Sequence, residues 1–163
     1  MAAGQTIQVW GAGSAILGAS AAHPVAVQAA PNLFAYGFPS ATEGWTVFQG
    51  YLGKQYGGNG VNLTLTWMCS ATSGTVEWGG AFFRMNNGLY LPSAITWSTE
   101  ITASVAAPGL AGQIAYTTLN FSSAQIAGIQ VGELFLLRVR RIVSVAGNSP
   151  GQAGLISAQA VEG

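Results

Sequence analysis

The sequence predicts an all-β protein: an antiparallel β-sandwich of jelly-roll type with about eight strands and an extended N-terminal arm. Two observations support this fold class. Apolar and polar residues alternate with a period of two in several short segments, which is the pattern of a strand with one face in a core. Turn sequences rich in Gly, Asn, Ser and Pro separate these segments. No long helical pattern lies between them, which argues against a parallel α/β sheet.

Residues 1–32 are predicted to form the arm, and residues 33–163 the jelly-roll domain. The arm is rich in Ala and Gly, and its only strand pattern is the alternation at residues 5–10. We expect it to clamp onto a neighbouring subunit or another protein through apolar anchors. The alternative is that it packs back on its own sandwich as an added edge strand. The expected anchors are Ile7, Val9, Trp10, Ile16, Leu17 and Val25.

The remaining strands are predicted at residues 45–52, 61–67, 75–85, 94–106, 112–122, 133–145 and 153–161. The clearest alternation runs from Val61 to Trp67, where apolar residues take turns with Asn and Thr. Residues 122–130 predict one or two helical turns capped by Ser122 or Ser123. The core is predicted to contain Val61, Leu63, Leu65, Trp67, Trp78, Phe82, Phe135, Leu137 and Val139.

Charge is scarce, because only 10 of the 163 residues are charged, none is Asp, and the formal net charge is zero. Ordinary soluble domains are about a quarter charged. A surface this neutral predicts self-association or coverage by another protein. It argues against nucleic acid, which needs clustered Lys and Arg. No apolar run is long enough to span a bilayer, so no membrane partner is expected. Residues 1–9 contain neither Lys nor Arg, so no secretion signal is expected.

Catalytic chemistry is not expected. His23 is the only histidine and Asp is missing, which leaves no triad and no metal-ligand cluster. The glycines of Gly11–Gly18 do not fit a dinucleotide fingerprint, because Ile16 stands at the third glycine position. We therefore predict no catalytic residue, no metal and no cofactor.

Three single-residue interpretations complete the chemistry. Glu77 and Glu133 could form a glycosidase pair, but salt bridges with arginines on neighbouring strands (Arg84, Arg138 or Arg140) are favoured. Cys69 is interpreted as a small buried hydrophobic residue. Most of the five tryptophans are assigned to the core rather than to sugar stacking, with Trp10 as the exception.

Three stretches resemble small jelly-roll virion proteins of tailed bacteriophages: Gly60–Trp67, Ser70–Arg84 and Val131–Arg141. The resemblance covers roughly residues 45–145 and not the arm. It implies a capsid decoration (cement) protein, a homotrimer made in the host cytoplasm and seated on the outer capsid surface, where it contacts the major capsid protein. It implies no catalytic residue.

Two other functions stay open at this stage. The first is another virion component from the tail, baseplate or a fibre. The second is a carbohydrate-binding β-sandwich. A row of solvent-exposed aromatic side chains beside polar hydrogen-bonding side chains would favour the sugar binder. A buried aromatic core with an arm ordered by a partner would favour the virion protein.

Overall fold

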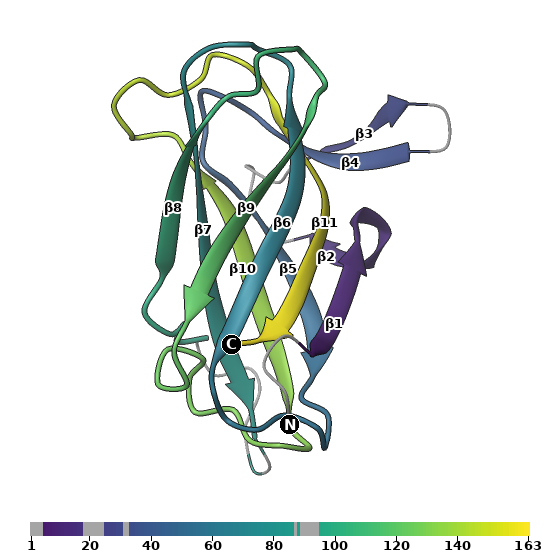
Figure 1. The fold of residues 1–163 in the computed structure, drawn as a ribbon, viewed down its shortest axis with the longest axis vertical. Coiled ribbons are helices and arrows are strands. Elements are labelled where there is room, and N and C mark those ends of the chain that lie inside the picture. The colour runs from purple at the N-terminus through teal and green to yellow at the C-terminus, as the bar shows by residue number, and fades with distance from the viewer. Residues whose placement is uncertain (1–4, 18–24, 31–32, 87, 89–94) are drawn as a thin grey trace.

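The computed structural model describes residues 5–17, 25–30, 33–86, 88 and 95–163. Over these residues the chain forms two antiparallel sheets packed face to face (Figure 1). This confirms the predicted all-β sandwich. In the described part of the chain, no helix has the length and apolar character needed to cross a membrane.

The first sheet, sheet A, has six strands in the order β3-β4-β11-β6-β9, with β1 also paired to β11. The second, sheet B, has five strands in the order β2-β5-β10-β7-β8. The strands of sheet A are β1 (Thr6–Gly11), β3 (Val25–Ala30), β4 (Leu33–Phe38), β6 (Val61–Cys69), β9 (Ile114–Phe121) and β11 (Ala153–Glu162). Those of sheet B are β2 (Ala15–Leu17), β5 (Gly44–Tyr51), β7 (Thr75–Met85), β8 (Ile101–Ala106) and β10 (Leu134–Ile142).

The core lies between the sheets and combines aliphatic side chains with a set of packed aromatic rings. All nine predicted core residues are buried, which confirms the period-two interpretation. Trp67 and Trp78 meet edge-to-face at 6.0 Å from the two sheets. The Trp67 indole N–H donates to Thr117 Oγ1 at 2.9 Å, so its only polar group is satisfied. Cys69 is also buried, as expected of a small hydrophobic residue.

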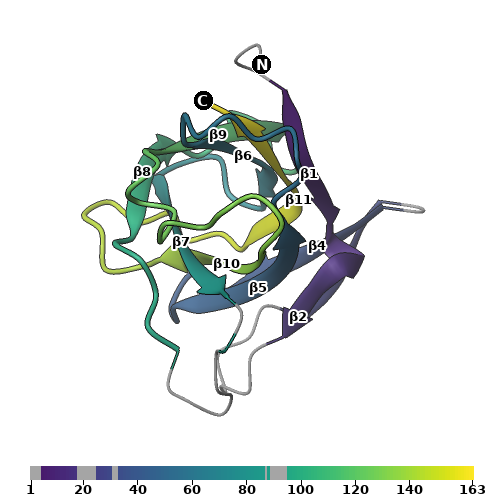
Figure 2. The same cartoon turned by 90° about the horizontal axis from the view of Figure 1, so that it is seen from below.

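The N-terminal segment is extended in its described parts, and these parts pair with the chain's own sandwich. β1 pairs with β11 of sheet A, and β2 pairs with β5 of sheet B. A short 3-10 helix, Ala12–Ser14, connects β1 to β2. Seen from below, β1 and β2 run along one side of the sandwich between the two sheets (Figure 2). Residues 5–17 therefore follow the alternative prediction, in which the segment packs back on its own sandwich as an added edge strand.

Two local predictions are wrong. The strand expected at residues 94–106 begins only at Ile101, and residues 95–100 form a strap without strand pairing. The helical turns expected at residues 122–130 are successive β-turns. Ala127 and Gly128 adopt φ angles of 59° and 65°, in the left-handed region, which a right-handed helix cannot contain.

Candidate functional site

Most of the charged side chains bind partners within the chain instead of standing unpaired at the surface. Eight of the ten form ion pairs or buried hydrogen bonds: Glu43, Arg84, Glu100, Glu133, Arg138, Arg140, Arg141 and Glu162. Glu162 is 1% exposed, and its Oε1 accepts the Gly57 backbone N–H at 2.7 Å. Most of the surface is left to uncharged groups.

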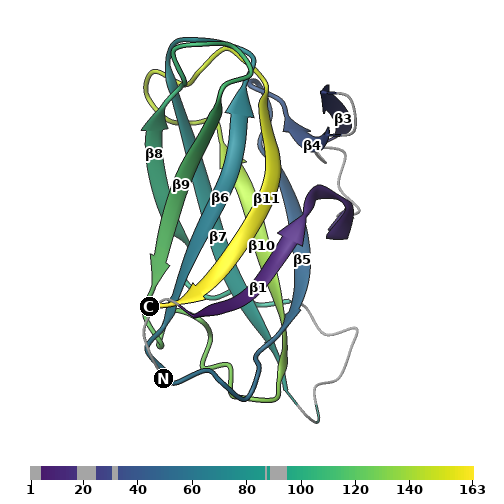
Figure 3. The same ribbon diagram turned by 45° about the vertical axis from the view of Figure 1, so that its right-hand side comes forward.

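Uncharged residues occupy the outer side of sheet A on four adjacent strands, β1, β11, β6 and β9. These strands lie side by side in Figure 3. Strand register aligns them in rows across the sheet. The three rows are Thr6–Val161–Asn62–Asn120, Val9–Gln159–Thr64–Thr118 and Gly11–Ser157–Thr66–Tyr116. We call these positions the sheet A face. None of them is charged. By ordinary strand spacings the face measures about 14 Å by about 14 Å.

The same alternation that builds the core builds this face. In β6, residues 61, 63, 65 and 67 point inward, so Asn62, Thr64 and Thr66 point outward. Strand β9 repeats the pattern with Tyr116, Thr118 and Asn120 exposed. On these two strands, each face residue is therefore next in sequence to a residue buried in the core, which fixes its position on the sheet.

Tyr116 is the dominant feature of the face because its side chain is 67% exposed. It presents a flat ring and a phenolic hydroxyl at the corner of the polar rows. The hydroxyls of Thr64 and Thr118 lie 3.2 Å apart, and the Gln159 amide donates to Thr6 Oγ1 at 3.2 Å. The hydroxyl and amide groups of the face can both donate and accept hydrogen bonds.

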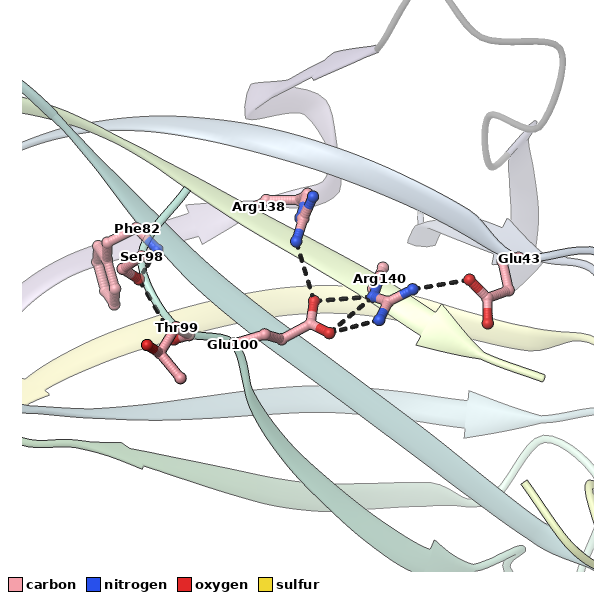
Figure 4. Close-up of polar contacts among 7 residues, drawn as sticks. All are labelled: Glu43, Phe82, Ser98, Thr99, Glu100, Arg138 and Arg140. Atoms are coloured by element: carbon pink, nitrogen blue, oxygen red, sulfur yellow. Dashed lines mark hydrogen bonds and ion pairs between the residues drawn. The ribbon is translucent and has the colours of Figure 1, made fainter. Parts of the chain in front are cut away.

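The outer side of sheet B has a different character. The strap at residues 95–100 crosses it and is held by an ion cluster (Figure 4). Arg140 contacts both Glu100 and Glu43, and Arg138 reaches the same Glu100 carboxylate at 3.2 Å. The Glu100 carboxylate sits over Gly79, where a Cβ would lie 2.9 Å from it. The part of this side over β7 and the middle of β10 is therefore covered and cross-linked.

Contacts and burial shift the pKa values of Glu133, Arg140 and Tyr56. The hydrogen bond from Arg84 lowers the pKa of Glu133, and the Gln130 backbone N–H lowers it further. The hydrogen bond with Glu100 raises the pKa of Arg140. Burial raises the pKa of Tyr56 at the end of the sandwich. None of these groups lies on the sheet A face.

Among the predicted anchors, Trp10 lies in the chain's own core and is 2% exposed. Its ring packs on Phe48 and Phe135, and its indole N–H donates to the Gln49 carbonyl at 2.7 Å. Ile7 packs against the same core, while Val9 is 55% exposed on the sheet A face. Trp10 is thus engaged within its own chain, and whether the segment also contacts a partner stays a prediction.

The other three anchors lie on short strands that pair with the sandwich. Ile16 and Leu17 belong to β2 and Val25 to β3. The salt-bridge interpretation is confirmed for Glu133, which pairs with Arg84 at 2.6 Å. The single histidine, His23, lies outside the described residues.

In the part of the chain that the structure describes, no group of three or more His, Cys, Asp or Glu side chains converges. Sequence reasoning missed the sheet A face, although every strand in it was predicted. The polar half of each alternation was the available signal, but the order of the strands could not be deduced from it.

Comparison with known proteins supports the fold and not a family. No protein-family model matches the chain, and no curated protein matches it. Among solved structures, a CBM36-1 domain of a multidomain xylanase, from the hindgut metagenome of Trinervitermes trinervoides, is similar with a TM-score of 0.54. It shares 9% identity, and the match covers 94% of each chain.

Two weaker structural matches are also carbohydrate-binding modules. A CBM28 module specific for non-crystalline cellulose has a TM-score of 0.46, 13% identity and coverage of 92% of this chain and 88% of its own. A CBM22-1 xylan-binding domain from Paenibacillus barcinonensis has a TM-score of 0.45, 8% identity and coverage of 98% and 96%. At such identities the likeness concerns the β-sandwich alone.

Proposed function

We propose that this protein is a carbohydrate-binding β-sandwich that binds a neutral glycan on the sheet A face. The observation that carries the proposal is the combination of uncharged polar rows with Tyr116, whose side chain is 67% exposed. A neutral sugar offers hydroxyls that both donate and accept. Hydroxyl and amide side chains match that chemistry without the desolvation cost of a charge.

Tyr116 would supply the apolar part of the recognition. One side of a pyranose ring exposes C–H groups, and a flat aromatic ring can cover them while its hydroxyl stays in contact with water. Thr66 is its register partner on β6, and Thr118 follows two residues along the same strand. A sugar seated on the ring would therefore have hydroxyl groups beside it.

The open shape of the face favours a stretch of chain over a single enclosed sugar. Four strands lie side by side in the sheet, and no strap comparable to residues 95–100 is described across them. Among the described residues, no position of the sheet A face carries a charge and the four arginines are paired or buried elsewhere, so the face itself offers an acidic glycan no cationic side chain. The proposed ligand is therefore neutral and extended.

An array of neutral and acidic oligosaccharides tests the proposal. We expect binding to neutral glycans, weakened about fivefold or more by Tyr116→Ala, which corresponds to about 1 kcal/mol of ring contact. Tyr51→Ala is the matched control, because Tyr51 is 47% exposed on β5 of the other sheet. Equal losses in both variants, or binding to acidic glycans alone, would contradict the proposal.

A second candidate is a structural virion protein, a homotrimer on the outer capsid surface that contacts the major capsid protein. The neutral surface favours it, because ten charges in 163 residues leave large uncharged areas suited to protein contacts. Sedimentation at micromolar concentration and imaging of particles test this candidate. A stable monomer that does not bind particles would exclude it.

A further inference from the structure

One end of the sheet A face changes from polar to apolar. The row beyond Thr66 and Tyr116 pairs Met68 with Ile114. Ile114 is 41% exposed, and Leu110 in the adjoining turn is 70% exposed. Exposed apolar side chains of this size, grouped at one end of a polar face, indicate a surface that binds an apolar group of another molecule.

The same row contains a cavity of about 240 Å³. Two members of the row Gly37–Gly154–Met68–Ile114 line it, Gly154 and Met68, while the Gln152 side chain lies over Gly37, where a Cβ would be 2.6 Å from its Nε2. A Cβ on Gly154 would lie 3.2 Å from Met68 Cε and 3.3 Å from the Ala35 Cβ, which is tighter than ordinary contact, so the glycine leaves room for the Met68 side chain in the cavity wall.

The wall of this cavity offers few free polar groups. Ala111 and Gly112 close it from the turn, which is fixed by the Gly112 N–H donating to the Cys69 carbonyl at 2.8 Å. The Gln152 N–H donates to Ser70 Oγ at 2.9 Å, and the Ser70 N–H donates to the Gln152 carbonyl at 3.0 Å. These groups are satisfied by each other, which leaves the exposed Gln152 amide as the polar side chain of a wall otherwise formed largely by Met68, Ala111 and two glycines, so the cavity suits an apolar occupant.

We propose that the ligand is a glycoside whose neutral sugar carries an alkyl or acyl group, with the sugar on the polar rows and the apolar group in the cavity beside Met68. This inference rests on the proposed function and specifies its ligand class. The polar and apolar parts of the face are continuous, because the pair Met68–Ile114 is the next outward-facing pair after Thr66–Tyr116 on strands β6 and β9. A ligand covering Tyr116 therefore reaches Met68 and Ile114.

Isothermal titration with paired glycosides tests the inference. The probes are methyl and hexyl β-glycosides of neutral trisaccharides of glucose, galactose and xylose, used below the concentrations at which they form micelles. We expect the hexyl member to bind about tenfold more tightly, which burial of about two methylene groups provides. Met68→Ser in the cavity wall and Ile114→Ser at its register partner should remove this gain and leave methyl glycoside binding unchanged. Leu134→Ser is the matched control, because Leu134 is 39% exposed on β10 of sheet B.

The possible results separate the two proposals. Binding of neutral glycans without a gain from the hexyl group overturns this inference and leaves the proposed function standing. A hexyl gain that is insensitive to Met68→Ser and Ile114→Ser also overturns it. A gain without any binding of neutral glycans would make the cavity a plain apolar site and overturn both.

Discussion

At the scale of single residues, stability depends on a few large side chains whose polar atoms are paired inside the core. Trp67 is fully buried and its N–H is bonded to Thr117. Trp67→Ala is expected to lower the free energy of unfolding by about 3–5 kcal/mol, because it leaves a cavity and an unpaired hydroxyl. Reversible urea denaturation measures this. Tyr116→Ala on the exposed side should change stability by under about 1 kcal/mol, and a similar small loss for Trp67→Ala would contradict the core assignment.

Arg141 is the charged residue buried most completely, at 0% exposure. Its guanidinium donates to the carbonyls of Phe38, Ser149 and Gly151 at 2.6–3.1 Å, and burial lowers its pKa. Arg141→Lys should destabilise the protein by about 2–4 kcal/mol, because one ammonium cannot reach acceptors spread around a planar fork. Arg84→Lys at the surface is the control, expected to leave the denaturation midpoint nearly unchanged. Equal midpoints for both variants in chemical denaturation would refute this role.

At the scale of elements, the Arg84–Glu133 pair joins the end of β7 to the start of β10. Its lowered Glu133 pKa means that the folded state binds protons less readily than the unfolded chain, whose glutamate pKa is about 4.3. The stabilisation is therefore fully present above that pH and is lost as the pH falls through the folded-state pKa. Melting temperatures of the wild type and Glu133→Gln should converge below about pH 4. A constant difference from pH 7 to 3 would show that the ion pair does not contribute.

The N-terminal segment tests the link between strand pairing and stability. Deleting residues 1–11 removes β1 and the Trp10 ring that fills the space beside Gly50. We expect the truncated protein to lose about 3 kcal/mol or more, since Trp10→Ala alone should cost about that much. Thermal denaturation of both variants measures it. Unchanged stability with loss of self-association would instead support the clamp predicted from the sequence.

At the scale of the whole molecule, the sequence was sufficient to predict the sandwich and its core. Alternation in β6, β7 and β10 is local, so burial can be read directly from the order of residues. The face that we propose as the binding site depends on strands β1, β6, β9 and β11, which are distant in the sequence and meet only through pairing. Alternation predicts which residues point outward, but not which of them become neighbours.

Two further features could not be predicted from the sequence, each for a different physical reason. Trp10 was expected to reach a neighbour, because a weakly periodic segment gives no sign that β11 has room for another strand. The strap at residues 95–100 has strand-like composition but is held by Glu100 and by Ser98, which bonds to the Phe82 backbone. Such tertiary contacts replace strand pairing without changing the local pattern.

The central claim is that neutral glycans bind the sheet A face. The most direct measurement is a ¹H–¹⁵N NMR titration of the full chain with the tightest-binding neutral oligosaccharide from the array. We predict saturable shifts concentrated in the amides of β6, β9 and β11 around Tyr116, and their loss in Tyr116→Ala. Shifts confined to sheet B or to the loops at either end of the sandwich, or no saturable shift with any neutral oligosaccharide, would contradict the claim.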